Sequence, residues 1–451
     1  MTTKANKFYG GVHPHEGKLS RRDAILAAPL QPLYTVPLQM HIGAPAKAVV
    51  DKGDKVLRGQ VLGEAGGFVS APVHSPTSGT VREVTTCLGV NGAQLPALVI
   101  ESDGEDTECE PMPAIADWEN ADPKVLLKRI ADAGIVGMGG AAFPTAVKLS
   151  PPPGREVDTL ILNGVECEPC LTADHRLMLE SPHQVVSGAL IVGRILGVKR
   201  IVIAIEANKQ DAIGLMREAV SGTPVDVMEL RVRYPQGAEK QLIYAVTGRV
   251  VPSGKLPMDV RCVVMNVASA AACGDAVCNG RPLYERITTV TGTPLVNPRN
   301  YKFRIGTLYS TALELCGGVK EGVEVAKVIS GGPMMGFSVY SLDIPVMKNT
   351  SGILLLSDEE LRQFSPSACI RCGHCNDACP MELQPGILSV QIEHQKFDLA
   401  EKWHVMDCIE CGCCAYICPA GRPLVQHMRR AKAVVIAARK AASAAAQGAK
   451  K

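Results

Sequence analysis

The sequence contains few aromatic residues and almost no excess charge of either sign. Phe, Trp and Tyr make up 4% of its 451 residues, and the formal net charge is +2. A balanced charge gives no reason to expect nucleic acid as a partner. No stretch reaches the roughly 18 uninterrupted apolar residues typical of a membrane-spanning helix, and the first residues contain no apolar signal core. The sequence therefore predicts a soluble or peripheral protein.

Glycine and proline are abundant instead, with 43 and 31 residues. Both residue types mark turns, so their number favours small β-rich modules joined by tight connections. A chain of 451 residues is also too long for a single hydrophobic core, and the usual size of domains predicts about three of them. We therefore expect a multidomain protein that combines an α/β domain with small β modules.

Cysteine is the most informative residue type. Eight of the 17 cysteines form two copies of the pattern C-x2-C-x2-C-x3-C-P near the C-terminus. This pattern binds cubane iron–sulfur clusters, and in paired copies the fourth cysteine of each run ligates the other cluster. We predict one [4Fe–4S] cluster on Cys369, Cys372, Cys375 and Cys418, and a second on Cys408, Cys411, Cys414 and Cys379. Cys413 lies outside the spacing and is not a predicted ligand.

Two other interpretations of the cysteines are zinc sites and a disulfide scaffold. Zinc sites usually include histidine or use two separated C-x2-C pairs, and disulfide scaffolds are typical of short secreted chains. Clustered thiolates that stay free for iron indicate a reducing compartment, such as the bacterial cytoplasm.

A small β module is predicted over residues 37–104, after an N-terminal segment of residues 1–36. Residues 49–63 and 70–84 alternate apolar and polar side chains around Gly- and Pro-containing turns. The module resembles the barrel-sandwich fold of biotinyl and lipoyl carrier domains but lacks the lysine that a carrier modifies. We expect a structural or docking role. The candidate metal ligands here, which can equally be turn or surface residues, are His13, His15, His41 and His74.

An α/β domain is predicted over residues 123–275. Strand patterns at 159–164 and 200–207 alternate with helical patterns at 125–135 and 181–197, which favours a largely parallel sheet. Such sheets bind ligands at the carboxyl ends of their strands. We therefore expect the functional residues of this domain to lie in the loops that follow the strands.

Several loops of the α/β domain carry candidate binding residues. A glycine-rich loop runs from Gly137 to Lys148 and suits a phosphate, although a plain turn is an equally simple interpretation. The other candidates, which follow strands or form a separate loop, are Asn163, Glu166, Glu168, Tyr234, Gly237, Glu239 and Asn266. Two carboxylates at one strand end can hold ribose hydroxyl groups or can simply be solvated.

The order of these segments resembles a known family. GGVHPHEGK, VPLQMHIGAPA, GMGGAAFPTAVKL, YPQGAEKQLI, SGGPMMG and the doubled cysteine run occur in this order between about residues 10 and 420. They are similar to the RnfC family, which belongs to the ion-pumping Rnf ferredoxin:NAD oxidoreductases. They are also related to the flavin subunit of respiratory complex I.

The resemblance implies a cofactor-binding site and a role for each of its residues. FMN would lie against Gly137, Gly139 and Gly140, with Lys148 toward its phosphate. The residues implied around the flavin ring and ribityl chain are Asn163, Glu166, Tyr234, Gly237 and Asn266. Phe143 would stack on the NADH adenine, and Glu168 and Glu239 would hold the dinucleotide. For Phe143 and Tyr234, simple core packing is the alternative.

The chain departs from the complex I pattern at three positions close to this site. Val165 stands where complex I has an acid, Cys167 where it has a serine, and Ala238 where it has a glutamate. These differences leave the phosphate site intact, but they bear on the NADH pose and on the hydrogen bonds to the flavin.

Three further regions complete the predicted organisation. Residues 281–356 resemble the small β-grasp (SLBB) domain and are expected to act as a spacer between flavin and clusters, with GGPMMG as a tight structural turn. Residues 360–422 are expected to form an α-helical, ferredoxin-like domain with both clusters. Residues 423–451 are predicted as a basic helical tail, since no acidic residue follows Cys411. Such a helix binds an anionic membrane or a partner, or is simply solvated.

The predicted function is electron transfer within an enzyme complex. NADH would reduce FMN, and single electrons would pass to the clusters and to ferredoxin or a ferredoxin-like subunit, or in reverse. The resemblance implies a peripheral subunit on the cytoplasmic face of the bacterial inner membrane, coupled to ion translocation. The alternatives are a soluble flavin and iron–sulfur reductase of the cobalamin-reductase type, which as a family lacks the barrel-sandwich module, and an electron wire with a vestigial flavin site.

Overall fold

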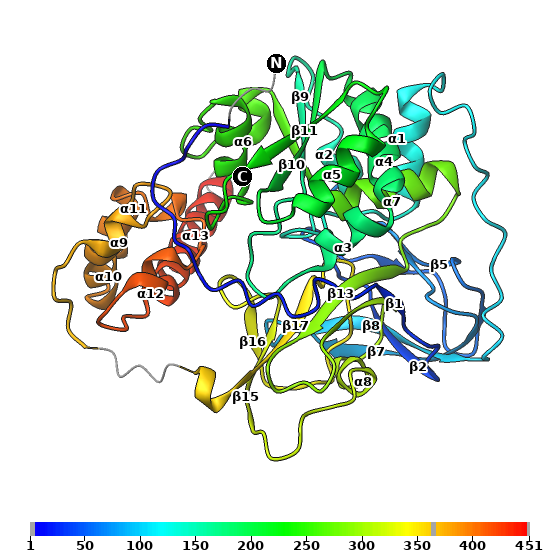
Figure 1. The fold of residues 1–451 in the computed structure, drawn as a ribbon. Coiled ribbons are helices and arrows are strands. Elements are labelled where there is room, and N and C mark those ends of the chain that lie inside the picture. Colours follow the sequence, from blue (N-terminus) through cyan, green and yellow to red (C-terminus); the bar gives the residue numbers. More distant parts are fainter. Residues whose placement is uncertain (1–4, 362–366, 449–451) are drawn as a thin grey trace.

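The structure, a computed structural model, describes residues 5–361 and 367–448. Residues 362–366 of the predicted cluster domain and 449–451 of the predicted tail lie outside the described residues. Figure 1 shows the α/β domain beside two β-rich parts, with the cysteine-rich helical domain packed on its other side. None of the helices in the described ranges combines the length and apolar character that crossing a lipid bilayer takes.

The barrel-sandwich module consists of two small antiparallel sheets. One has the strand order β2-β8-β7-β4 and the other the order β3-β5-β6. The alternation predicted from the sequence places Val36, Val81, Leu98 and Ile100 inside, where they are fully buried. The strands are β2 (Leu33–Pro37), β3 (Lys47–Ala48), β4 (Lys55–Val56), β5 (Val61–Glu64), β6 (Val73–His74), β7 (Gly79–Leu88) and β8 (Gln94–Ser102).

The α/β domain has a four-stranded parallel sheet of order β11-β10-β9-β12, as the sequence predicts. Its strands are β9 (Thr159–Asn163), β10 (Arg200–Glu206), β11 (Val225–Leu230) and β12 (Cys262–Asn266). Buried aliphatic residues fill β9 and β10, as expected for a sheet covered on both faces. The helices are α1 (Pro123–Asp132), α2 (Thr145–Lys148), α3 (Ala173–Glu180), α4 (Pro182–Leu196), α5 (Gln210–Ala219), α6 (Glu239–Thr247) and α7 (Val267–Cys278), with the 3-10 helix η1 (Pro257–Val260).

The β-grasp region forms a six-stranded mixed sheet of order β1-β14-β13-β17-β15-β16. Its edge strand β1 (Leu26–Ala27) comes from the N-terminal segment and pairs in parallel with β14. The predicted segment of residues 1–36 therefore contributes to a sheet whose other strands lie far away in the sequence. The other elements are β13 (Glu285–Thr291), β14 (Arg299–Arg304), β15 (Val325–Ser330), β16 (Phe337–Val339), β17 (Gly352–Ser357), α8 (Tyr309–Leu315) and η2 (Asp358–Glu360).

The cysteine-rich domain is helical, and its two cysteine runs have matching backbones. Arg371 and Glu410 have φ values of +58° and +57°, and Gly373 and Gly412 have values of +83° and +84°. Each glycine precedes a short helix, as equivalent positions of a repeated unit should. The helices are α9 (His374–Asp377), α10 (Pro385–Glu393), α11 (Phe397–Lys402), η3 (Val405–Asp407), α12 (Cys413–Ile417) and α13 (Leu424–Gly448).

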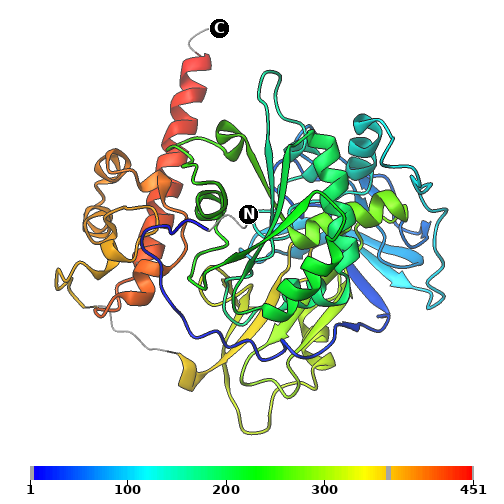
Figure 2. The same ribbon diagram turned by 45° about the horizontal axis from the view of Figure 1, so that its top comes forward.

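The first turns of α13 belong to the core of the cysteine-rich domain. Leu424, Met428 and Ala431 are at most 1% exposed, and Met428 and Ala431 pack with Leu388 of α10. The later part of α13 projects away from the body of the protein, as Figure 2 shows. The predicted tail therefore has two parts, one that completes the cysteine-rich domain and one that is exposed.

The expectation that the β-grasp domain separates flavin and clusters is wrong. The cysteine-rich domain packs directly on the α/β domain: Tyr234 Oη donates to the carbonyl oxygen of Cys411 at 2.7 Å, and Gln241 Nε2 donates to that of Pro380 at 3.0 Å. The two domains are distant in sequence, so no local pattern indicated this contact. The β-grasp sheet lies beside the junction, not between the two domains.

Candidate flavin and iron–sulfur site

The carboxyl edge of the parallel sheet gathers several of the predicted flavin residues. Asn163 ends β9 and Asn266 ends β12, and the two are direct partners in the strand register. The side chain of Asn266 caps α7 by accepting from the amide of Ala268 at 2.8 Å. Asn163 Nδ2 donates to the carbonyl oxygen of Gly237 at 2.8 Å. Parallel strands thus bring residues that are distant in sequence to one place, as the sequence predicts.

The glycine-rich loop lies against this edge. It closes on itself through a hydrogen bond from the Gly137 amide to the Phe143 carbonyl oxygen at 2.9 Å. Gly139 is exposed and faces Asn266: a Cβ at Gly139 would lie 2.9 Å from Asn266 Nδ2. Gly140 is exposed with open space beside it, and Phe143 is half-buried within the loop. Only glycine permits this close approach of the backbone to the strand end.

Lys148 and Glu239 meet on the same side of the sheet. Lys148 Nζ donates to the carbonyl oxygen of Val264 at 2.9 Å and lies 3.6 Å from Glu239 Oε1. Glu239 is the first residue of α6, where a carboxylate is favoured by the helix dipole. The structure therefore brings together the predicted phosphate lysine and one of the two acids predicted to hold the dinucleotide.

Glu166 and its neighbours form an acidic group beside the glycine loop. Glu166 accepts from the amides of Asp174 and His175 at 2.7 and 3.1 Å and so caps α3. Asp174 in turn accepts from Asn266 Nδ2 at 2.6 Å. Burial, and then the charge of Glu166, raise the pKa of Asp174 to about 6. Asp174 was not predicted, since it stands on a helix without a motif of its own.

Arg286 is a second residue that sequence reasoning missed. It lies on β13 of the β-grasp sheet, is 3% exposed, and donates from a terminal nitrogen to the carbonyl oxygen of Met138 at 3.2 Å. Burial lowers its pKa, while the charges of Asp174 and Glu166 oppose that shift. A lone arginine in a strand of another domain gives no sequence signal for this position.

The predicted residues Glu168 and Tyr234 face away from the glycine loop. Glu168 Oε1 accepts from the amides of Met334 and Met335 at 2.6 and 3.0 Å, so it caps the GGPMMG turn, and burial raises its pKa. GGPMMG is a tight turn as predicted, closed by Gly336 N donating to Gly332 O. Tyr234 is 3% exposed and bonds to Cys411. Its packing in the junction is the alternative that the sequence left open.

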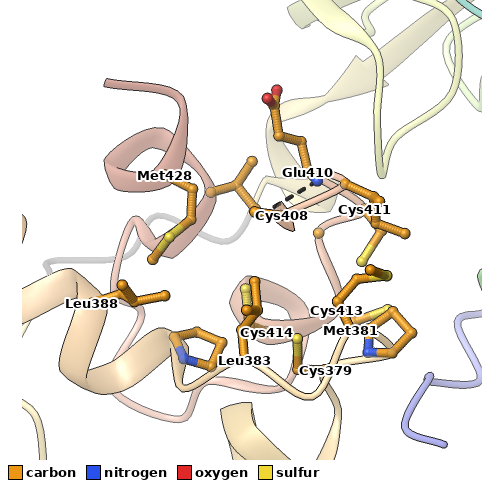
Figure 3. A pocket seen from close by; sticks show the side chains of 15 residues that line it. Cys379, Met381, Leu383, Leu388, Cys408, Glu410, Cys411, Cys413, Cys414 and Met428 are labelled. Atoms are coloured by element: carbon orange, nitrogen blue, oxygen red, sulfur yellow. Dashed lines mark hydrogen bonds between the residues drawn. The ribbon is translucent and has the colours of Figure 1, made fainter. Parts of the chain in front are cut away.

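The eight cysteines separate into two groups that mix the two runs. One space is lined by Cys379, Cys408, Cys411 and Cys414, together with Leu388 and Met428, and Figure 3 shows their side chains around it. A second space is lined by Cys369, Cys372, Cys375 and Cys418. The fourth cysteine of each run thus joins the first three of the other. Within the described residues, no three His, Cys, Asp or Glu side chains converge closely enough for a single metal ion.

We call the first group the proximal set, because it adjoins the α/β domain, and the second the distal set. Cys411 of the proximal set accepts from Tyr234, and Cys413 is buried in the same contact cluster. The distal set is more open: Cys372 is exposed, and Ile370 close to it is 65% exposed. The geometry therefore orders the two spaces from the flavin domain to the surface.

The candidate histidines show no shared site in the described part of the chain. His41 and His74 are buried in the barrel-sandwich module, where His41 Nε2 accepts from the amide of Ala71 at 3.1 Å. Burial lowers the pKa of His74 to about 3, with a smaller effect from Lys348. His13 and His15 are exposed on the N-terminal segment. The four side chains therefore belong to separate surroundings.

The residues at the strand edge fit a flavin phosphate by their chemistry. Gly139 leaves space that a Cβ would fill, Lys148 and Arg286 bring positive charge, and the Nε of Arg286 is buried without a partner among the described residues. Asp174 Oδ1 is likewise buried without a partner in the described ranges. The two cysteine sets provide thiolates, which are the ligands of iron–sulfur clusters.

Four family models match the chain. They are the RnfC barrel sandwich hybrid domain at residues 6–105, the Nuo51 FMN-binding domain at 130–275, the SLBB domain at 287–338, and the 4Fe-4S dicluster domain at 362–419. These matches confirm the predicted fold class and the predicted cofactors, FMN and two [4Fe–4S] clusters.

Curated relatives match over nearly the full chain. The RnfC-type component of the proton-translocating ferredoxin:NAD(+) oxidoreductase complex of Clostridium ljungdahlii is 46% identical over 427 residues, which cover 94% of this chain and 93% of the relative. The Na(+)-translocating counterpart of Acetobacterium woodii is 45% identical, covering 98% and 99%. The corresponding component of the ion-translocating oxidoreductase complex of Rhodobacter capsulatus is 40% identical, covering 94% and 82%.

Proposed function

The chain belongs to the RnfC family of ion-translocating ferredoxin:NAD(+) oxidoreductase complexes, and we propose that it carries electrons between NAD(H), FMN and two [4Fe–4S] clusters. The observation that supports this most directly is the junction of Tyr234 with Cys411, which joins the flavin domain to the proximal set at 2.7 Å. A chain that merely bound both cofactors would not need its cluster domain packed on the flavin loops.

The residues of the strand edge bind and orient the flavin in this proposal. FMN, when bound, exchanges a hydride with NAD(H) and single electrons with the clusters. Lys148 and the amides of the glycine loop hold its phosphate, and Arg286 supports the loop through Met138. Asn163 and Asn266 fix the loops that flank it. Glu239 keeps Lys148 in place and stands where the dinucleotide would approach.

The two cysteine sets act in sequence. The proximal set of Cys379, Cys408, Cys411 and Cys414 exchanges electrons with the flavin, because it is the set in contact with the α/β domain. The distal set of Cys369, Cys372, Cys375 and Cys418 exchanges them with a partner, because Cys372 is exposed. That partner is ferredoxin or a ferredoxin-like subunit of the same membrane complex.

Anaerobic titration with NADH tests the proposed function. We expect NADH to bleach the flavin absorbance and the cluster absorbance of the purified chain together. Clusters that stay oxidised while the flavin is reduced would contradict transfer between them. Cob(III)alamin, added as an acceptor after reduction, examines the alternative of a cobalamin reductase, and rapid turnover with it would favour that function.

We also propose that the chain docks peripherally on the cytoplasmic face of the inner membrane through the exposed part of α13. Residues from Ile436 to Ala445 are all exposed, and no acidic residue follows Cys411. Lysine and arginine next to an anionic bilayer contribute about 1 kcal/mol each. Residues 437–451 carry four of them, Arg439, Lys440, Lys450 and Lys451.

Deletion of residues 437–451 is expected to weaken binding to vesicles with anionic lipid by at least about tenfold, since it removes those charges. The iron content should stay unchanged, because Leu424 to Val435 of α13 remain in the cluster domain. Vesicle co-sedimentation at two salt concentrations measures the effect, and uncharged vesicles are the control. Equal binding of both chains to anionic vesicles would exclude this docking mode.

A further inference from the structure

The N-terminal motif GGVHPHEGK, residues 10–18, has no role in the function described so far. Figure 1 shows this segment running along the junction between the cysteine-rich domain and the α/β domain, before it reaches the β-grasp sheet. The described chain links these two domains covalently only through the distant β-grasp region. Their relative position therefore depends on contacts such as those of this segment.

The first contact of the segment is with the proximal set. The amide of Gly11 donates to the carbonyl oxygen of Ala378 at 2.9 Å. Gly10 has φ of +71°, and a Cβ placed on it would lie 2.7 Å from the carbonyl carbon of Cys379. The backbone of the segment thus lies directly on the backbone of a predicted cluster ligand, which only glycine allows.

The second contact is with the loop of Tyr234. Val12 and Tyr234 exchange two backbone hydrogen bonds, of 2.8 and 3.0 Å. The same tyrosine donates to Cys411 through its hydroxyl group. The segment, the flavin-domain loop and the proximal set are therefore joined by three consecutive hydrogen bonds.

The third contact is with residues 166–171, which follow β9 and include Glu166. Lys18 Nζ donates to the carbonyl oxygens of Glu166, Glu168 and Leu171 at 3.0, 3.2 and 2.6 Å. An ammonium group has three donors, and all three are used. The carbonyl oxygen of Glu16 also accepts from the amide of Cys170 at 2.7 Å. Burial lowers the pKa of Lys18, and the charge of Glu166 partly offsets that shift.

We propose that residues 10–18 form a strap that fixes the flavin-site loops relative to the proximal set, and that Lys18 is the positioning residue for residues 166–171. The proposal rests on the proposed function, since it assigns the strap to the transfer of electrons between flavin and proximal cluster. The strap holds both sides of the junction: Gly10 and Gly11 contact the cluster loop, Val12 the tyrosine loop, and Lys18 the loop after β9.

Gly10→Ala tests the strap at its cluster end. The added methyl group displaces the segment from Cys379, and a displacement of about 1 Å in a reacting geometry can cost up to about 100-fold in rate. We expect reduction of the clusters after mixing with NADH to slow at least about tenfold, while reduction of the flavin stays within a factor of about two. Stopped-flow absorbance separates the two phases.

Gly222→Ala is the matched control for Gly10→Ala. Gly222 has φ of +78° and nothing within 4 Å of an added Cβ, so the substitution causes the same backbone strain without the contact. Its cluster phase should equal that of the unchanged chain. Equal cluster rates in all three chains would overturn the strap.

Lys18→Met tests the other end by a measurement that needs no electron transfer. Amide hydrogen exchange of residues 166–171 in the purified chain should become at least about tenfold faster, because three carbonyl oxygens lose their donor. Lys320→Met is the control, since Lys320 Nζ makes one exposed hydrogen bond to Thr293 O. Unchanged exchange in Lys18→Met would reject the positioning role. Faster exchange in a chain whose clusters never accept electrons from NADH would instead reject the proposed function and leave the strap standing.

Discussion

Replacing Cys379 and Cys408 together by alanine is expected to remove one [4Fe–4S] cluster and to leave the other, the same loss that either single substitution causes. Both cysteines line the proximal set with Cys411 and Cys414, whereas Cys418 lines the distal set. If the fourth cysteine of each run ligates the other cluster, the two substitutions damage the same site and their effects do not add. Iron and acid-labile sulfide per chain measure the result.

The complementary pair is Cys379 with Cys369. These belong to the same run in sequence but to different sets in space, so Cys369→Ala with Cys379→Ala should remove both clusters. Cys413→Ala is the control, because Cys413 is buried beside the proximal set but lies outside the ligand spacing. Loss of both clusters in the Cys379 and Cys408 pair, with one kept in the Cys369 and Cys379 pair, would mean that each run holds its own cluster.

Much of the fold follows from local patterns. The strand predicted at 159–164 is β9, and the helix predicted at 181–197 is α4, each within one residue of its observed bounds. Alternation and helical periodicity indicate which face of an element is buried, and that information is local. The parallel sheet then places Asn163 and Asn266 side by side, so part of the strand-edge site could also be predicted.

The junction between the domains could not be predicted in this way. Tyr234 bonds to a carbonyl oxygen 177 positions later, and Glu168 to amides 166 and 167 positions later. Such pairs involve backbone atoms, which are the same in every residue and carry no sequence signal. Arg286 was missed for a related reason, since its contact with Met138 depends on how the β-grasp sheet packs on the glycine loop.

Lys348 is a further residue without a sequence signal, and it joins three domains. It belongs to the β-grasp region and is fully buried, and its Nζ donates to the carbonyl oxygens of Pro72 and Gly134 at 2.6 and 2.7 Å. Pro72 lies in the barrel-sandwich module, and Gly134 follows α1 at the base of the glycine loop. Burial alone lowers the pKa of Lys348 to about 7.

Lys348→Met is expected to lower the free energy of unfolding by about 2–4 kcal/mol at pH 9, because two buried carbonyl oxygens lose their donor. Methionine is similar in length, so it leaves no large cavity. Urea unfolding followed by circular dichroism measures the change. Lys320→Met, at an exposed lysine that also bonds a carbonyl oxygen, should change stability little. A loss of the same size in both variants would mean that burial of Lys348 has no special effect.

The effect of Lys348→Met should also grow with pH. The neutral amine has two N–H donors for its two carbonyl acceptors, whereas the ammonium has a third donor and a buried charge. In the unfolded chain the lysine keeps its usual pKa of 10.5, so between pH 7 and 10.5 the unfolded state binds more protons and the native state gains stability as pH rises. His74 and His41 are the titratable groups whose pKa Lys348 lowers, and with a pKa of about 3 His74 stays neutral over this range. The difference in stability between the unchanged chain and Lys348→Met should therefore widen by about 1 kcal/mol per pH unit from pH 7 to 9. A difference that is constant with pH would show that Lys348 is charged in the folded protein throughout, and that the three-domain contact is made by an ammonium group.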